Sequence, residues 1–304
     1  MGIRTALPIV DNAELAPMVG ADPAWLLHAT GIEQRRFAGP GETVATLGIA
    51  AAKDCLSTAG IPASDVGFVI VSSGSAEKRF PGPASTIAAA AGIAGKPAID
   101  LPMASAGGLF GLALAAQLAP RYGQVLVVAS EIMSRVVYMH PAGRDTAILF
   151  GDGAGACLVS NDTGFAEIID SVLATDGDFA EALRLDFDAP LYMDGRTIIL
   201  QASRKLPRAI GEVLERNQVK PSEIGTFLLH QANLNLMTRM AQVVGAPVER
   251  FFCNIAKYGN TSSASLLIAA AEWWSKSEKP LTAPIVLAAF GAGLNWGALL
   301  ARPV

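Results

Sequence analysis

A segment of this chain occurs twice, and the repeat constrains the fold more than any other feature of the sequence. Residues 60–71 resemble residues 218–229, and each copy is typical of a helix end, a turn and a buried strand. Further along, residues 99–118 match residues 252–271 as a strand, a turn and a long helix rich in small side chains. The repeat therefore predicts two copies of one αβ unit.

Two copies of a unit in which strands and helices alternate favour two sheets covered by helices. A solenoid would need at least three short repeats. We therefore expect an α/β protein with an N-terminal half over residues 1–160 and a C-terminal half over residues 161–304. With 304 residues, of which 51% are hydrophobic, the chain is long enough to bury a large core.

Charge and cysteine content exclude several classes of function. The formal net charge is −4, and no basic patch of the kind that binds nucleic acid stands out in the sequence. Cys55, Cys157 and Cys253 are odd in number and lack C-x-x-C spacing. This pattern is typical of a reducing compartment, and it predicts neither disulfides nor a metal site.

Two stretches without charged residues, 101–120 and 283–301, are long enough to be mistaken for membrane spans. Both contain glycine and polar residues near their middles, and the chain does not start with a signal-peptide pattern. Central helices and strands that are buried on every side also read as apolar throughout. We therefore expect a soluble, cytoplasmic protein that does not contact a membrane.

Three polar residues stand where apolar runs end. Ser105 follows the run 97–101 and opens a helix, His230 follows the run 227–229, and Asn260 lies at the equivalent turn of the second half. Side chains at such strand ends usually face a ligand in α/β proteins. Because Ser105 belongs to the first half and the other two belong to the second, we expect the site to lie between the halves.

These blocks, taken in order, resemble the β-ketoacyl-acyl-carrier-protein synthase III family, condensing enzymes of the thiolase superfamily. The resemblance runs from about Trp25 to the C-terminus and includes residues 30–32, the turn 150–155 and the glycine-containing loop 290–293. It implies a duplicated, five-layer αβαβα fold. The family carries a catalytic Cys where this chain has Ser105.

The alignment with the family nucleophile makes Ser105 the candidate reacting group, and the alternative is that it only caps the following helix. A helix N-terminus can lower a thiol pKa until the thiol ionises, but a hydroxyl needs a general base. His230 is the only base that the motifs offer. The other two histidines, His28 and His140, are expected to lie on a helix face and in a loop.

The resemblance also implies how charge on the substrate is stabilised. The family residues that match His230 and Asn260 stabilise a thioester enolate and assist acyl transfer. Residues 290–294 replace the family's usual run of three glycines, so a methyl group enters the loop that lends an N–H to the oxyanion hole. Ala292 keeps its N–H, and we expect the hole to be formed by the backbone amides of Ser105 and Ala292.

Coenzyme A contacts are only partly preserved. Trp25 and Arg144 match the pair that sandwiches the adenine, whereas Ala29 stands where the family normally has an Arg that meets the phosphates. Leu200 and Asn235 take positions where basic residues usually dock the carrier protein. Without these cations the protein attracts an acidic carrier domain less strongly, so the sequence does not decide whether the reaction uses a carrier protein.

Two further residues are assigned to the substrate site on the resemblance, Asn233 in the His230 motif and Phe80. The segment 80–83 resembles the one that reaches into the partner subunit's acyl pocket. We therefore predict a homodimer, whose interface would also absorb surplus apolar surface.

The leading interpretation is an acyltransferase that takes an acyl group from an acyl thioester onto Ser105. It then passes the group to carbon, in a 3-oxoacyl condensation of fatty acid or polyketide biosynthesis, or to oxygen or nitrogen. The donor is acyl-CoA or an acyl-carrier protein, and no separate cofactor is expected. Two alternatives are a non-catalytic subunit paired with an active paralogue and a thioester hydrolase. A serine introduced to trap a complex would look the same in sequence.

Overall fold

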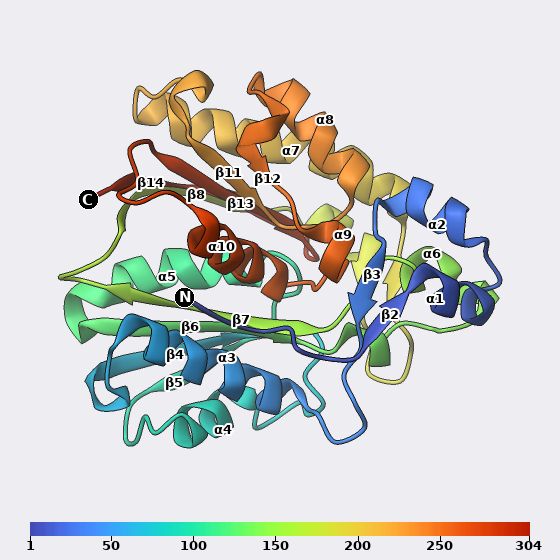
Figure 1. Ribbon diagram of the computed structural model, residues 1–304, viewed down its shortest axis with the longest axis horizontal. Coiled ribbons are helices and arrows are strands. Elements are labelled where there is room, and N and C mark those ends of the chain that lie inside the picture. The colour runs from blue at the N-terminus through green and yellow to red at the C-terminus, as the bar shows by residue number, and fades with distance from the viewer.

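The computed structural model describes residues 1–304 as two five-stranded sheets with helices between and outside them (Figure 1). The first sheet has the strand order β1-β7-β6-β4-β5 and the second the order β12-β11-β13-β14-β8. The strands of the first sheet are β1 (Gly2–Arg4), β4 (Val66–Ser72), β5 (Ala98–Leu101), β6 (Gln124–Glu131) and β7 (Gly153–Ser160). Those of the second are β8 (Ala166–Thr175), β11 (Thr226–Leu229), β12 (Phe251–Phe252), β13 (Ile285–Gly291) and β14 (Asn295–Pro303).

The two sheets repeat the same strand directions. β4 runs parallel to β5 and β6, and β6 pairs with β7 in the antiparallel sense. In the second sheet β11 runs parallel to β12 and β13, and β13 pairs with β14 in the antiparallel sense. The carboxyl ends of the parallel strands in each sheet therefore point toward one edge, where side chains from both halves can meet.

The helices complete a five-layer αβαβα arrangement, which confirms the predicted fold class (Figure 1). Two apolar helices lie between the sheets, two cover the outer face of the first sheet, and two cover the outer face of the second. In that order they are α5 (Gly107–Tyr122), α10 (Ala264–Lys276), α3 (Val44–Ala59), α4 (Pro83–Ala90), α7 (Gly195–Arg216) and α8 (Leu234–Val244).

The middle layer is packed closely because small residues line it. A Cβ added to Gly108, in the first turn of α5, would lie 2.7 Å from the carbonyl oxygen of Ser263, just before α10. Side chains of both helices share one core, for example Leu109 and Leu112 with Leu267. The uncharged stretches of the sequence are thus buried strands and inner helices, and none of the helices has the length and apolar character needed to cross a bilayer.

Smaller elements cover the carboxyl-end edge of the two sheets. Two short antiparallel pairs, β2 with β3 and β9 with β10, lie apart from the main sheets. Their bounds, with those of the remaining helices, are β2 (Ile9–Asp11), β3 (Gln34–Arg36), β9 (Leu183–Arg184), β10 (Tyr192–Met193), α1 (Asn12–Val19), α2 (Pro23–Thr30), α6 (Arg144–Ala147) and α9 (Ile255–Tyr258).

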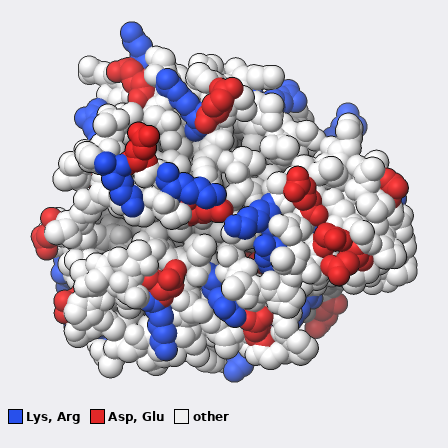
Figure 2. All heavy atoms as spheres, viewed as in Figure 1, with Lys and Arg blue, Asp and Glu red and all other residues white.

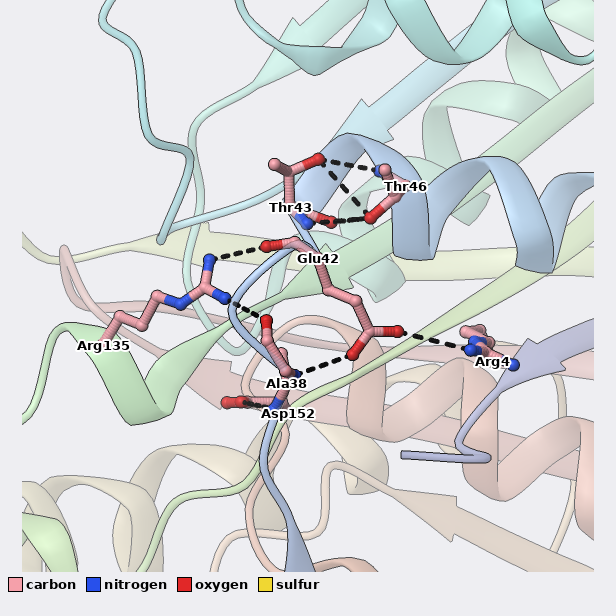
Figure 3. Close-up of polar contacts among 8 residues, drawn as sticks. Arg4, Ala38, Glu42, Thr43, Thr46, Arg135 and Asp152 are labelled. Atoms are coloured by element: carbon pink, nitrogen blue, oxygen red, sulfur yellow. Dashed lines mark hydrogen bonds and ion pairs between the residues drawn. The ribbon is translucent and has the colours of Figure 1, made fainter. Parts of the chain in front are cut away.

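A polar network fixes the loop that leads from β3 into α3 (Figure 3). Arg135 donates to the carbonyl oxygens of Glu42 and Gly39, each at 2.7 Å. The buried carboxylate of Asp152 accepts the N–H of Ala38 at 2.7 Å and the hydroxyl of Ser134 at 2.6 Å. Burial raises the pKa of Asp152 although these donors favour its charged form.

Charged side chains of both signs are interspersed on the face seen in Figure 2, with no large area of one sign. This distribution matches the small net charge of −4. The visible face therefore offers no basic track for a nucleic acid backbone.

Candidate active site

Ser105, His230 and Asn260 line one cavity of about 410 Å³ between the two halves. Ser105 lies in the turn between β5 and α5, His230 directly follows β11, and Asn260 lies between α9 and α10. Each of the three is nearly buried, with 6–7% of its surface exposed. The structure thus brings together the three residues that the sequence analysis singled out from distant segments.

The backbone of Ser105 is held in an uncommon conformation. Its φ is 60°, in the left-handed region that a side chain with a Cβ rarely adopts. Gly291 lies directly against it, because a Cβ on Gly291 would lie 2.7 Å from the Ser105 Cβ and 2.4 Å from the Ala104 carbonyl oxygen. A glycine at the end of β13 is therefore required for Ser105 to fit between the halves.

The N–H of Ser105 donates to Ser262 Oγ at 3.0 Å. Ser262 is itself left-handed, with φ of 48°, and this conformation directs its hydroxyl across the boundary between the halves. The predicted oxyanion hole includes this N–H. The structure gives it a different partner, so a substrate oxygen at this N–H would have to share it with Ser262 or displace the hydroxyl.

The imidazole of His230 is held by one serine. Its Nδ1 lies 2.5 Å from Ser265 Oγ, and that oxygen also accepts the N–H of Gln231 at 3.2 Å. Burial lowers the pKa of His230 to about 4, so the ring is neutral at neutral pH. When Nδ1 carries the proton and donates to Ser265, Nε2 has a free lone pair and can act as a base.

Asn260 is fixed as a hydrogen-bond donor. Its Oδ1 accepts the N–H of Ser262 at 2.9 Å, and its Nδ2 makes no hydrogen bond within the protein. Its backbone is held as well, since its N–H donates to Leu149 O and its carbonyl accepts the N–H of Gly151. The carboxamide nitrogen therefore remains available to a ligand in the cavity.

The mouth of the cavity carries an aromatic ring and a cation. Trp25 is 42% exposed, and the guanidinium carbon of Arg144 lies 5.1 Å from its ring centroid. Arg144 does not line the cavity itself. Arg196 does, and it is the only Lys or Arg among the lining residues. It comes from a stripe on α7 that lines the cavity over three turns: Gly195, Arg196, Ile198, Ile199, Ala202 and Leu206.

Asn233 lines the cavity and also caps α8. Its Oδ1 accepts the N–H of Asn235 at 2.9 Å, while its Nδ2 donates to the carbonyl oxygen of Ala29 at 3.0 Å. The side chain therefore ties α8 to the end of α2. Asn233 and Trp25 line the same cavity, so this residue of the predicted substrate site also has a structural role.

Comparison with known proteins identifies the family. A family model described as 3-oxoacyl-[acyl-carrier-protein] synthase III matches residues 99–177, and the model for its C-terminal part matches residues 214–302. The β-ketoacyl-[acyl-carrier-protein] synthase III of Oleidesulfovibrio alaskensis is 34% identical, over 97% of this chain and 94% of the relative. This chain belongs to the synthase III family.

Solved structures agree over nearly the whole length. The 3-oxoacyl-[acyl-carrier-protein] synthase III of Aquifex aeolicus has a TM-score of 0.94 at 32% identity, covering 99% of this chain and 97% of that one. The priming β-ketosynthase of the R1128 polyketide pathway has a TM-score of 0.91 at 29% identity, covering 99% and 94%. The predicted family and the prediction of an acyltransferase are both confirmed.

Within this synthase III chain, several details differ from the sequence-based expectations. The alternative that Ser105 caps α5 is wrong, because the cap position is Ala106 and no side chain caps the helix. Ala292 does not line the cavity, whereas its neighbour Gly291 does. Phe80 is 87% exposed and lies outside the cavity of its own chain, so its predicted place in a partner subunit's pocket stays a prediction.

Two serines that hold the active site of this synthase III chain were not predicted from the sequence. Ser262 contacts Ser105 and Asn260, and Ser265 contacts His230. The signal that could have revealed them is the hydroxyl-rich run 261–265, which follows Asn260 and lies in a segment that is otherwise apolar. For α7, the sequence shows only apolar residues spaced three and four apart, a pattern that predicts a buried helix face but not a face that lines a cavity.

Proposed function

We propose that this synthase III chain forms an oxyester on Ser105 from an acyl thioester and then transfers the acyl group to an acceptor. The observation that carries the proposal is a single cavity holding a buried hydroxyl, a neutral imidazole and a carboxamide nitrogen without a protein partner. These three groups supply a nucleophile, a base and an oxyanion donor.

In the first step Nε2 of His230 takes the proton from Ser105 Oγ as that oxygen attacks the thioester carbonyl. The carbon–sulfur bond breaks, and the thiolate leaves with the proton that the imidazolium returns. For the negative charge on the carbonyl oxygen in this step, the proposed donors are the backbone N–H groups of Ser105 and Ala292, and Asn260 Nδ2 acts in the second step. Because burial disfavours the imidazolium of His230, its proton passes on readily to the departing sulfur.

In the second step an acceptor attacks the oxyester carbonyl and frees Ser105. For a 3-oxoacyl product the acceptor is the carbanion left when a malonyl thioester loses carbon dioxide. The new carbon–carbon bond forms as the ester bond breaks, and the departing Ser105 oxygen takes a proton from solvent. The enolate accepts hydrogen bonds from Asn260 Nδ2 and from His230 in the tautomer that carries its proton on Nε2, with Ser265 then donating to Nδ1. The names of the relatives, which are 3-oxoacyl-[acyl-carrier-protein] synthases, support this outcome over transfer to oxygen or nitrogen.

For the donor we propose acyl-CoA. The Arg144 guanidinium carbon lies 5.1 Å from the centroid of the Trp25 ring, and an aromatic ring beside a guanidinium suits an adenine that would enter between them. Leu200 is 44% exposed and Asn235 is also exposed, so the positions that the resemblance assigns to carrier docking present no charge. The thiols of Cys55, Cys157 and Cys253 are unpaired, which supports a cytoplasmic location.

We also propose that the protein is a homodimer. β5 is an edge strand of the first sheet, and its Ile99 is 40% exposed. Phe80 projects into solvent on the segment that follows β4. An unpaired strand edge beside exposed apolar side chains is a surface that a second copy could cover. Light scattering at micromolar concentration should give twice the chain mass of 31.5 kDa, and a single 31.5 kDa species would refute the dimer.

Intact-mass spectrometry tests the acyl-enzyme directly. Incubation with short acyl-CoAs should add the mass of one acyl group to the wild-type chain and none to Ser105→Ala. Peptide mapping should place the group on Ser105. If the wild-type chain gains no mass at saturating donor concentration, the proposed reaction is wrong.

A further inference from the structure

A carboxylate with no exposed surface, Glu131, lies at the end of β6. Its two oxygens accept the hydroxyls of Ser73 and Ser75 at 3.2 and 2.5 Å and the N–H of Gly74 at 3.0 Å. Ser263, from the other half, donates through both its hydroxyl at 2.6 Å and its N–H at 3.2 Å. Five donors from two halves thus converge on one buried side chain.

No cation accompanies this carboxylate, since none of the ion pairs of the protein includes Glu131. Burying an acidic side chain without a cation is costly, and hydrogen bonds alone offset that cost here. Removing the carboxylate would leave hydroxyl and amide donors on both halves without acceptors. The arrangement therefore holds the loop after β4 and the residues before α10 at a fixed separation.

The residues before α10 connect this carboxylate to the active site. Ser263 follows Ser262, whose hydroxyl accepts the N–H of Ser105 at 3.0 Å. The N–H of Ser262 donates to Asn260 Oδ1 at 2.9 Å and so orients the carboxamide. A shift of the 262–263 backbone would therefore move the support of both the nucleophile and the oxyanion donor.

We infer that Glu131 is a positioning residue for acyl transfer: by holding Ser263 it keeps the Ser262 hydroxyl against the N–H of Ser105. Ser105 has a left-handed backbone, which needs support from its surroundings. Glu131 contacts neither the cavity nor the reacting atoms, and it acts through the two serines. This role rests on the proposed reaction at Ser105.

The first test compares two buried carboxylates. In Glu131→Gln one acceptor oxygen becomes an amino group that faces donors, so the 262–263 turn should shift. The single-turnover acylation rate of Ser105 should fall by roughly 100-fold, as expected for a misplacement of about 1 Å, while KM for the acyl-CoA stays within about twofold. Ser263→Ala removes one of the five contacts and should act in the same direction with a smaller loss.

Asp152→Asn is the matched control. Asp152 is also fully buried and bound by donors, but its partners are Ser134 and Ala38, the second of which is drawn beside it in Figure 3. This variant should lower the melting temperature without slowing acylation, when both are assayed well below melting. Equal losses of acylation in Asp152→Asn and Glu131→Gln would mean that the effect is general destabilisation and would overturn the inference.

A second measurement needs no acyl donor. In a Ser105→Cys background, alkylation by iodoacetamide reports the thiolate fraction, which depends on how the helix N-terminus and nearby N–H groups face the sulfur. Adding Glu131→Gln should shift the pH profile of alkylation upward and lower the rate at pH 7 severalfold. An unchanged profile would overturn the inference. A shifted profile in a protein whose wild-type Ser105 never acylates would instead contradict only the proposed reaction.

Discussion

Neutral His230 makes the pH dependence of acylation the sharpest test of the proposed base. An ordinary imidazole with a pKa of 6.5 would be only about one-tenth neutral at pH 5.5, so a base of that kind would lose about tenfold in rate between pH 7.5 and 5.5. With the pKa lowered to about 4 by burial, nearly all of the His230 population remains neutral at pH 5.5. We expect the acylation rate to stay within about twofold over this range.

The same burial predicts a pH-dependent stability. The unfolded chain binds a proton at this residue below pH 6.5, whereas the folded chain binds it only near pH 4. Stability is therefore full above pH 6.5 and falls as the pH drops toward 4, by about 3 kcal/mol from this residue. Urea unfolding of wild type and His230→Gln at pH 7 and pH 4.5 isolates this contribution, because other groups affect both proteins alike.

The acylation assay is a rapid-quench experiment with intact-mass detection on wild type and on the double variant His28→Gln, His140→Gln. In that variant His230 is the one remaining histidine, so its ring resonances can also be titrated by NMR without overlap. An acylation rate that falls tenfold by pH 5.5, with a resonance midpoint near 6.5, would refute the argument from burial.

The remaining predictions concern single side chains of the site. His230→Ala should abolish acylation, because the Ser105 hydroxyl then has no base. Asn260→Ala should spare acylation and slow the transfer step, because a carboxamide removes no proton and contributes only hydrogen bonds. Equal loss of acylation in both variants would contradict these separate roles. Ser105→Cys should gain decarboxylative condensation with a malonyl thioester, because the acyl-enzyme becomes a thioester, which is a better acyl donor to carbon than an oxyester. The malonyl group is supplied both on CoA and on carrier protein. Rapid self-acylation of the variant without a condensation product from either malonyl donor would point to another acceptor. Gly291→Ala should slow acylation at least tenfold, because the added Cβ would lie 2.4 Å from Ala104 O, while Gly211→Ala, with no atom within 4 Å, should not.

The sequence predicted the architecture because the evidence for it is repetitive. Two copies of one strand-and-turn pattern, 60–71 and 218–229, were enough to indicate two similar sheets. The placement of Ser105 and His230 at one cavity also followed, since each comes after an apolar strand and parallel strands end at a common edge. Asn260 follows the short helix α9, and its place in the cavity was expected from the family resemblance.

The contacts between the halves could not be predicted in the same way. Ser262 and Ser105 are 157 residues apart, and Glu131 and Ser263 are 132 residues apart, so no local pattern links them. The left-handed backbone of Ser105 could not be predicted either, because a positive φ is usually indicated by glycine and this position holds a serine. Phe80 illustrates another limit, since its exposure has meaning only if a second subunit is present.

The central layer has a consequence for how the chain folds. α5 belongs to the first copy of the repeat and α10 to the second, and each covers the inner face that the other copy would leave exposed. Their backbones approach so closely that a Cβ on Gly108 would lie 2.7 Å from the carbonyl oxygen of Ser263. A chain cut near residue 160 would expose the apolar side of α5 and aggregate, although its own sheet is complete. The two copies are thus repeats in sequence and one cooperative unit in folding.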